Sequence, residues 1–161
     1  MNEKQFGNLV KNDRYQVFLF SCPACIPFNF AIHPWFVVNK KGALSRWEIG
    51  FLAQKREKSW GHLDLDILPL YQGIQMFAFI PYFHWEAQVI AIFEGEEDSL
   101  AAHMAEFITS SPQQYPLKDT YHLLGPNSNT FVQWVIDAFP ESGFRLPWGA
   151  IGKNYKVVDN V

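Results

Sequence analysis

The chain has 161 residues, of which 48% are hydrophobic and 17% aromatic, and its formal net charge at pH 7 is -3. This length and apolar content predict one domain, residues 1–161, with a sizeable core. We expect no nucleic-acid binding, because phosphate neutralisation requires clustered Lys and Arg. No apolar run reaches the roughly 18 residues of a membrane span, and no long apolar segment follows the N-terminus, so we expect a cytoplasmic protein.

β-Branched and aromatic residues dominate the first 95 positions and predict strands rather than helices. The predicted strands cover residues 14–20, 28–39, 44–52, 74–80 and 89–93. The second and third of these flank a Lys-Lys-Gly turn at residues 40–42 and therefore predict a hairpin. Residues 53–62 are charged and predict an exposed loop, whereas residues 63–73 fit no single element.

After residue 95 the apolar residues are no longer spaced as in strands. Leu100, Met104 and Ile108 recur at helical spacing and predict a helix over residues 98–109. A second helix is predicted after Gly-Pro-Asn-Ser-Asn-Thr-Phe at residues 125–131, and it is apolar enough to be buried on nearly all sides. Strands followed by helices indicate an α+β protein, in which an antiparallel sheet or partial barrel packs against the buried C-terminal helix.

The two cysteines form a Cys-Pro-Ala-Cys sequence, Cys22 to Cys25. A redox pair of the thioredoxin type should open a helix after a strand, but Pro27 and an extended apolar run follow here. A zinc site needs about four ligands, and the five histidines are not spaced to complete one. We therefore interpret these cysteines as a reduced loop pair and expect no metal and no cofactor.

Three polar residues in apolar surroundings are the candidate catalytic groups: His33, Glu48 and Ser128. The predicted hairpin places His33 and Glu48 as near neighbours on adjacent strands. A carboxylate beside a histidine fixes its tautomer and stabilises its charged form, which suits a general base that activates Ser128. Each residue also has a purely structural interpretation. His33 can be a core histidine whose hydrogen bonds are satisfied, Glu48 can pair with Arg46 or Lys40, and Ser128 can simply cap the helix.

The residues that follow resemble a bacterial domain-of-unknown-function family. They are His33-Pro34-Trp35, Trp47-Glu48, Tyr115-Pro116, Tyr121, the Gly-Pro-Asn-Ser-Asn-Thr-Phe motif, and Leu146-Pro147 followed by Ala-Ile-Gly-Lys-Asn-Tyr at residues 150–155. More distantly, the order of a histidine strand first and a nucleophile helix last is similar to circularly permuted papain-like proteins. These include NlpC-like peptidases, lecithin–retinol acyltransferase-like enzymes and PPPDE-like peptidases.

The resemblance implies a permuted papain-like fold with Ser128 at the nucleophile position, where several of those proteins carry cysteine. Such sites work because a helix N-terminus and a histidine stabilise a thiolate. A serine hydroxyl must instead lose its proton during attack, which demands close Ser–His geometry. The substitution indicates either a working serine variant or a site that has lost turnover and kept a pocket.

Three functions follow. The first is a degenerate, non-catalytic pocket for a small-molecule, peptide or acyl-type ligand, lined by Asn127, Asn129, Trp35, Trp47 and Trp134. The second is a hydrolase or acyltransferase in which Ser128 attacks, His33 moves the proton and Glu48 orients it. The third is an interaction protein that uses the aromatic run at residues 82–85 as an exposed patch. The sequence does not fix the oligomeric state.

Overall fold

The structure is a computed structural model that describes residues 1–78 and 80–157. Residue 79, within the predicted strand 74–80, lies outside the described residues, as do residues 158–161. Among the helices of the described part, none is long and apolar enough to cross a membrane.

Six strands form one sheet in the spatial order β4-β5-β3-β2-β1-β8, and every neighbouring pair is antiparallel. The strands are β1 (Tyr15–Pro23), β2 (Ile32–Lys40), β3 (Ala43–Ile49), β4 (Ser59–Trp60), β5 (Leu63–Leu65) and β8 (Gln88–Gly95). A separate hairpin consists of β6 (Gln72–Phe77) and β7 (Ile80–Glu86). The predicted antiparallel sheet is confirmed, and it does not close into a barrel because β4 and β8 are open edges.

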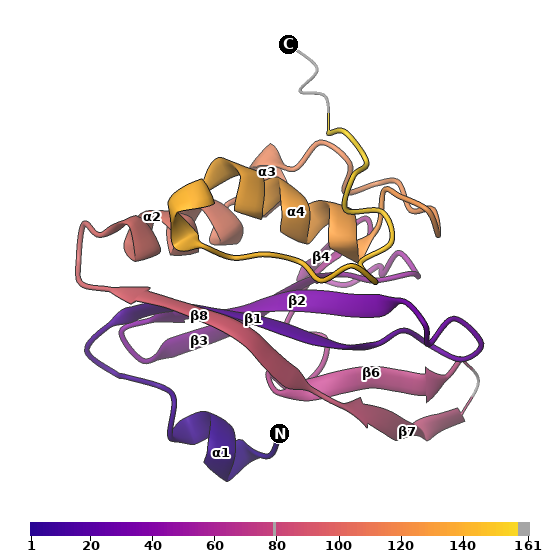
Figure 1. Cartoon of the computed structure of the whole chain (residues 1–161), viewed down its shortest axis with the longest axis horizontal. Coiled ribbons are helices and arrows are strands. Elements are labelled where there is room, and N and C mark those ends of the chain that lie inside the picture. The colour runs from indigo at the N-terminus through magenta and orange to yellow at the C-terminus, as the bar shows by residue number, and fades with distance from the viewer. Residues whose placement is uncertain (79, 158–161) are drawn as a thin grey trace.

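Different elements cover the two faces of this sheet (Figure 1). The helices are α1 (Glu3–Gly7), α2 (Leu100–Thr109), α3 (Ser111–Gln114) and α4 (Ser128–Ala138), followed by the 3-10 turn η1 (Pro140–Ser142). We call the side covered by α2 and α4 the helix face and the side covered by α1, β6 and β7 the hairpin face. The α+β class is therefore confirmed.

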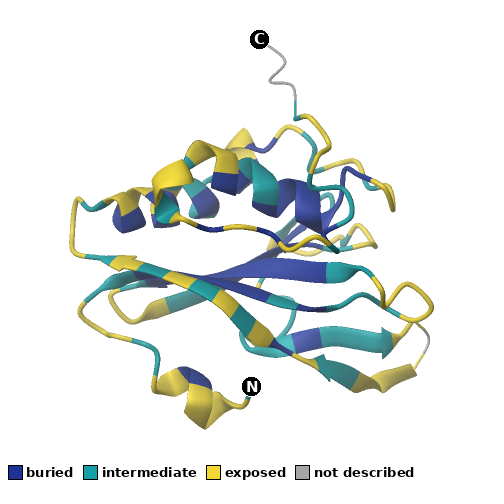
Figure 2. Cartoon of the chain, viewed as in Figure 1, coloured by how far each residue is buried: buried dark blue, intermediate teal, exposed yellow. Residues whose placement is uncertain are grey.

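Successive residues of the central strands enter the two cores in turn. In β1, Val17 and Leu19 belong to the core on the helix face, whereas Phe18 and Phe20 belong to the core on the hairpin face. Figure 2 shows β1 and β2 buried over most of their length. Because both faces are covered, the middle parts of these antiparallel strands are apolar on both sides instead of alternating with polar residues.

The sequence placed several element boundaries differently. The second strand begins at Ile32 rather than residue 28, and the third ends at Ile49 rather than residue 52. Pro81 lies within β7, which pairs only with β6 and therefore has a free edge, the kind of strand in which proline is tolerated. Helix α4 is buried along its first half, but Asp137 and Ala138 near its end are exposed.

The β2–β3 register follows the prediction. Phe36 pairs with Trp47 and Val37 with Arg46, which makes His33 and Glu48 diagonal neighbours on the same face. Their proximity, inferred from the hairpin turn alone, is confirmed.

Candidate functional site

A row of polar side chains crosses the hairpin face of the sheet near one end. Cys22 of β1 pairs in register with His33 of β2, and Glu48 of β3 pairs with Asp64 of β5. The His33 Nε2 atom lies 2.9 Å from Glu48 Oε2. Ser59 of β4 donates a hydrogen bond from Oγ to Asp64 Oδ1 at 2.5 Å. Five neighbouring strands thus each contribute one member, and we call this set the polar row.

Arg46 anchors the row from the same strand as Glu48, because residues two apart on a strand share a face. Its Nη2 donates to Glu48 Oε2 at 2.9 Å, and its Nε lies 2.7 Å from Oε1 without being well aimed at that oxygen. Its Nη1 donates to the carbonyls of Pro69 and Gln72 at 2.7 and 2.5 Å. The guanidinium also lies over the Trp35 ring, 4.2 Å from its centroid. Through these hydrogen bonds Arg46 connects residues 69–72, which lead into β6, to the sheet.

The buried acids of the row have opposite protonation tendencies. Burial acts to raise the pKa of Glu48, but the charges and hydrogen bonds of Arg46 and His33 outweigh it and hold that pKa at about 2. Burial raises the pKa of Asp64 to about 6 despite the Ser59 hydrogen bond, and the Glu48 charge adds to this effect. Burial also raises the pKa of the Cys22 thiol to about 12.

These protonation states limit the chemistry of the row. The Cys22 thiol is protonated near neutral pH, so it is not an activated nucleophile. Glu48 fixes one imidazole nitrogen of His33 and is itself neutralised by Arg46. His33, Glu48 and Asp64 are all buried. Within the described residues, no three His, Cys, Asp or Glu side chains are arranged to hold a metal ion.

Ser128 lies elsewhere. It is the first residue of α4, whose apolar residues Phe131 and Val132 pack on the helix face of the sheet. His33 is on the hairpin face, since it pairs with Cys22 of that core. Among the described residues, the imidazole hydrogen-bonds Glu48 and no bond links it to Ser128. The structure thus brings His33 and Glu48 together but does not place Ser128 beside them in one hollow.

The Asn residues that flank Ser128 tie the start of α4 to the rest of the fold. The Asn127 side-chain oxygen accepts from the N–H groups of Asn129 and Thr130, and its Nδ2 donates to the Ile151 carbonyl. The Asn129 Nδ2 donates to the carbonyls of Ile32 and Ile151 at 3.1 and 2.9 Å. These bonds satisfy backbone groups of three segments, and we call the arrangement the amide clasp.

Gly152 completes the amide clasp. Its φ of +95° favours glycine, and a Cβ there would lie only 2.6 Å from the Asn127 Nδ2. Its carbonyl accepts from the Thr130 hydroxyl at 2.8 Å. The two motifs, at residues 125–131 and 150–155, are therefore partners in one structural contact, a relationship that sequence alone did not reveal.

The three predicted pocket tryptophans do not line one cleft. Trp35 is fully buried on the hairpin face and stacks on Phe20. Trp47 is buried on the helix face, and Trp134 packs there against Phe107, with ring centroids 4.5 Å apart. The sheet separates Trp35 from the other two. Trp47 pairs in register with Phe36, and Trp35, the residue next to Phe36 on β2, points to the opposite face.

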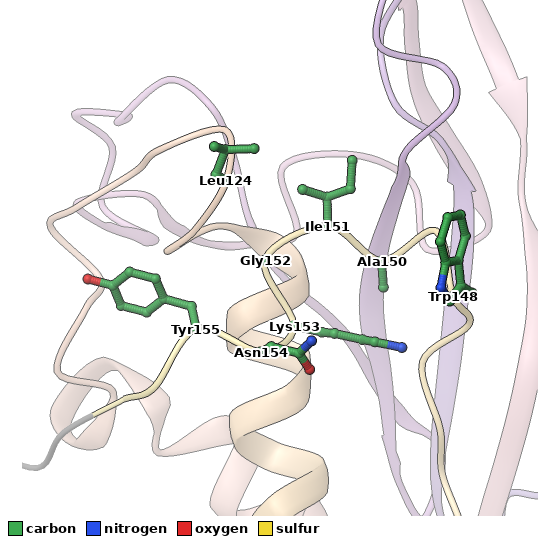
Figure 3. A pocket seen from close by; sticks show the side chains of 8 residues that line it. All are labelled: Leu124, Trp148, Ala150, Ile151, Gly152, Lys153, Asn154 and Tyr155. Carbon is green, nitrogen blue, oxygen red and sulfur yellow. The ribbon is translucent and has the colours of Figure 1, made fainter.

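A hollow that the sequence did not predict lies beside the amide clasp (Figure 3). Its volume is about 450 Å³. The residues that line it come from the loop before α4 and from the C-terminal segment: Leu124, Trp148, Ala150, Ile151, Gly152, Lys153, Asn154 and Tyr155. The only sequence signal was the motif at residues 150–155, which carried no assigned role.

Comparison with known proteins places the chain in a family without giving a function. Residues 15–155 match the family described as Protein of unknown function (DUF3750). The chain therefore belongs to this family, as its motifs led us to expect of a domain-of-unknown-function family. No curated protein and no solved structure matches the chain.

Proposed function

We propose that this protein is a non-catalytic binding module whose ligand, a peptide or acyl-type group, occupies the hollow beside the amide clasp. The observation that carries the proposal is the lining of this hollow: Leu124, Trp148 and Ile151 supply apolar surface, and Lys153 and Asn154 supply the few polar groups. Small-molecule sites commonly combine apolar walls with a few placed polar groups, at volumes of roughly 300–1,000 Å³.

Lys153 gives this hollow its preference for an anionic ligand end. Its Nζ donates to the carbonyls of Leu146 and Pro147 at 3.3 and 3.1 Å, which positions the side chain toward Trp148 (Figure 3). An ammonium has three N–H donors, so one is left for a carboxylate. A ligand with an apolar body and a carboxylate, such as a short fatty acid or a peptide C-terminus, satisfies both parts.

The permuted papain-like fold is part of this proposal. It is supported by the order of elements, with the histidine strand β2 before the Asn-flanked helix α4. In that interpretation Ser128 occupies a former nucleophile position. The separation of His33 from α4 by the sheet favours a module without turnover over a serine hydrolase, because a serine nucleophile requires a base within hydrogen-bond reach.

A ligand titration tests the proposal. Octanoate and an acetylated tripeptide that ends in leucine are added to isotope-labelled protein, and amide chemical shifts are followed by NMR. We expect shifts concentrated at residues 148–155. Trp148→Ala should weaken binding at least tenfold, by roughly the 1.4 kcal/mol or more that an apolar contact of this size contributes. Tyr82→Ala, another highly exposed aromatic position, away from the hollow, is the matched control.

Two outcomes would overturn the proposal. One is the absence of shifts at residues 148–155 with either probe at millimolar concentration. The other is labelling of wild-type protein, but not of Ser128→Ala, by a serine-reactive fluorophosphonate, which would establish Ser128 as a reactive nucleophile and favour the hydrolase alternative.

A further inference from the structure

Several connections that are distant in sequence meet at one end of the molecule (Figure 1). The loop between β1 and β2 bridges to the β6–β7 hairpin through Ile26 and Phe77. The same loop leads into Ile32, whose N–H donates to the Gly149 carbonyl. Phe51, just after β3, packs on Tyr121, with ring centroids 5.3 Å apart. We call this end, formed by residues 24–31, 50–58, 121–126 and 147–156 with Phe77 and Ile80, the loop end.

Large apolar side chains are exposed mainly at the loop end. Phe30 is 71% exposed, Leu124 79% and Trp148 96%. Phe28, Phe51 and Leu52 are exposed beside them. Single exposed apolar residues are ordinary, but a concentration from several separate loops at one end marks an interaction surface.

Charge is distributed along the same axis. Residues 15–39 and 67–85, which supply two of the loops, contain no Asp, Glu, Lys or Arg. The loop end carries five cations, Lys55, Arg56, Lys58, Lys153 and Lys156, and one acid, Glu57. The acidic residues 94–98 lie at the opposite end, which we call the far end, because Gly95 pairs with Tyr15 at the start of β1. Three of these acids are ion-paired there: Glu94 with Lys11, Glu96 with Arg14 and Glu97 with Lys41. The loop end is therefore basic and aromatic although the net charge of the chain is -3, whereas most acids of the far end are neutralised by ion pairs.

We propose that the loop end docks on an anionic lipid bilayer and inserts its aromatic loop side chains at the headgroup level. Aromatic and apolar residues flanked by Lys and Arg suit this interface, since rings occupy the headgroup region and cations attract anionic lipids. Side chains that stand on separate turns can each enter a fluid interface without a complementary protein surface. This proposal does not depend on the ligand proposed for the hollow.

Vesicle co-sedimentation tests the docking. The wild-type chain is mixed with vesicles of phosphatidylcholine plus phosphatidylglycerol, and with vesicles of phosphatidylcholine alone. We expect binding to the anionic vesicles that weakens with added salt. The double variant Phe28→Ser/Phe30→Ser should bind at least about tenfold more weakly. Leu100→Ser, an exposed apolar position at the far end, is the matched control and should bind like wild type.

A second double variant separates the contribution of charge to vesicle binding from that of the apolar side chains. Lys55→Glu/Arg56→Glu should reduce binding to the anionic vesicles and remove most of its salt dependence, while circular dichroism reports an unchanged fold. The Phe28→Ser/Phe30→Ser protein should still show the octanoate shifts at residues 148–155 if the hollow binds its ligand, so failure of either proposal is visible separately.

Three results would overturn the docking proposal: no binding of wild type to anionic vesicles, equal loss in Leu100→Ser and the Phe28/Phe30 double variant, or a concentration-dependent dimer in light scattering without lipid that the double variant abolishes. The last result would assign the loop end to a second copy of the chain.

Discussion

The Nε2 atom of His33 lies 2.9 Å from the Glu48 carboxylate, inside the protein and on the face of the sheet opposite α4. This pair, with Arg46, is a buried ionic cluster whose members all have partners. Such a cluster is costly to break because the remaining charges stay buried.

Replacing Glu48 by Gln should destabilise the fold by about 3–5 kcal/mol, since Arg46 would lose its counter-charge in a buried setting. Urea denaturation followed by tryptophan fluorescence measures the change. Glu97→Gln removes the partner of Lys41 in an exposed pair and should leave stability unaltered. A Glu48→Gln protein as stable as wild type would mean that the cluster is solvated in solution.

Stability should depend on pH through two acids with opposite effects. The folded pKa of Glu48 is about 2, below its ordinary 4.5, so its contribution is present above pH 4.5 and is lost as the pH falls toward 2. The folded pKa of Asp64 is about 6, above its ordinary 3.8. Its contribution to stability is therefore fully present below pH 3.8 and is lost as the pH rises through 6. The two windows predict a stability maximum near pH 4–5.

Asp64→Asn tests the second window, because Asn keeps an oxygen for the Ser59 hydroxyl but carries no charge. At pH 7 this variant should be more stable than wild type by on the order of 1–3 kcal/mol, and the difference should vanish near pH 4. Denaturation curves at both pH values provide the measurement. A constant difference across this range would show that Asp64 does not titrate there.

Asn129 and Ser128 are adjacent but should respond differently to alanine. Asn129→Ala removes two hydrogen bonds to the carbonyls of Ile32 and Ile151, so we expect a loss of about 1–3 kcal/mol. Ser128→Ala removes none of the amide-clasp bonds and should change stability by less than about 0.5 kcal/mol. Thermal unfolding of both variants measures the two stability losses. An equal loss in the two variants would show that the Ser128 hydroxyl makes a structural hydrogen bond.

Gly152 and Gly143 form a matched pair for the amide clasp. Both have a positive φ, at +95° and +71°, but only at Gly152 would a Cβ meet another group closely, the Asn127 amide. Gly152→Ala should therefore cost clearly more than the roughly 1 kcal/mol expected from backbone strain at Gly143→Ala. Similar unfolding midpoints for the two variants would argue against close contact between residue 152 and α4.

Tyr115 carries a buried hydroxyl without a hydrogen-bond partner among the described residues, and burial raises its pKa. Tyr115→Phe should leave stability unchanged or increase it by about 1 kcal/mol, because an unpaired buried hydroxyl is penalised. Tyr121→Phe at a partly exposed position is the control. Destabilisation by Tyr115→Phe would indicate that the hydroxyl has found a bound water.

The β2–β3 hairpin shows how far local sequence reasoning extends. The Lys-Lys-Gly turn fixed the register, and the register placed His33 beside Glu48, because cross-strand neighbours are set by counting from the turn. The α+β order of elements and the helix after the Asn-flanked motif also follow from local periodicity and capping. These features depend on residues close together in the chain.

Tertiary structure alone decided which face of the sheet each group occupies. Both faces are covered, so apolar residues occupy both sides of the central strands, and no simple alternation tells the face of His33 and Trp35 from that of Phe36 and Trp47. For this reason the sequence could not separate Ser128 from His33. Nor could it bring Asp64 beside Glu48, join the motifs at residues 125–131 and 150–155, or gather the exposed aromatic loops at one end. Each of these depends on contacts between segments far apart in the chain, and such contacts leave no local period to detect.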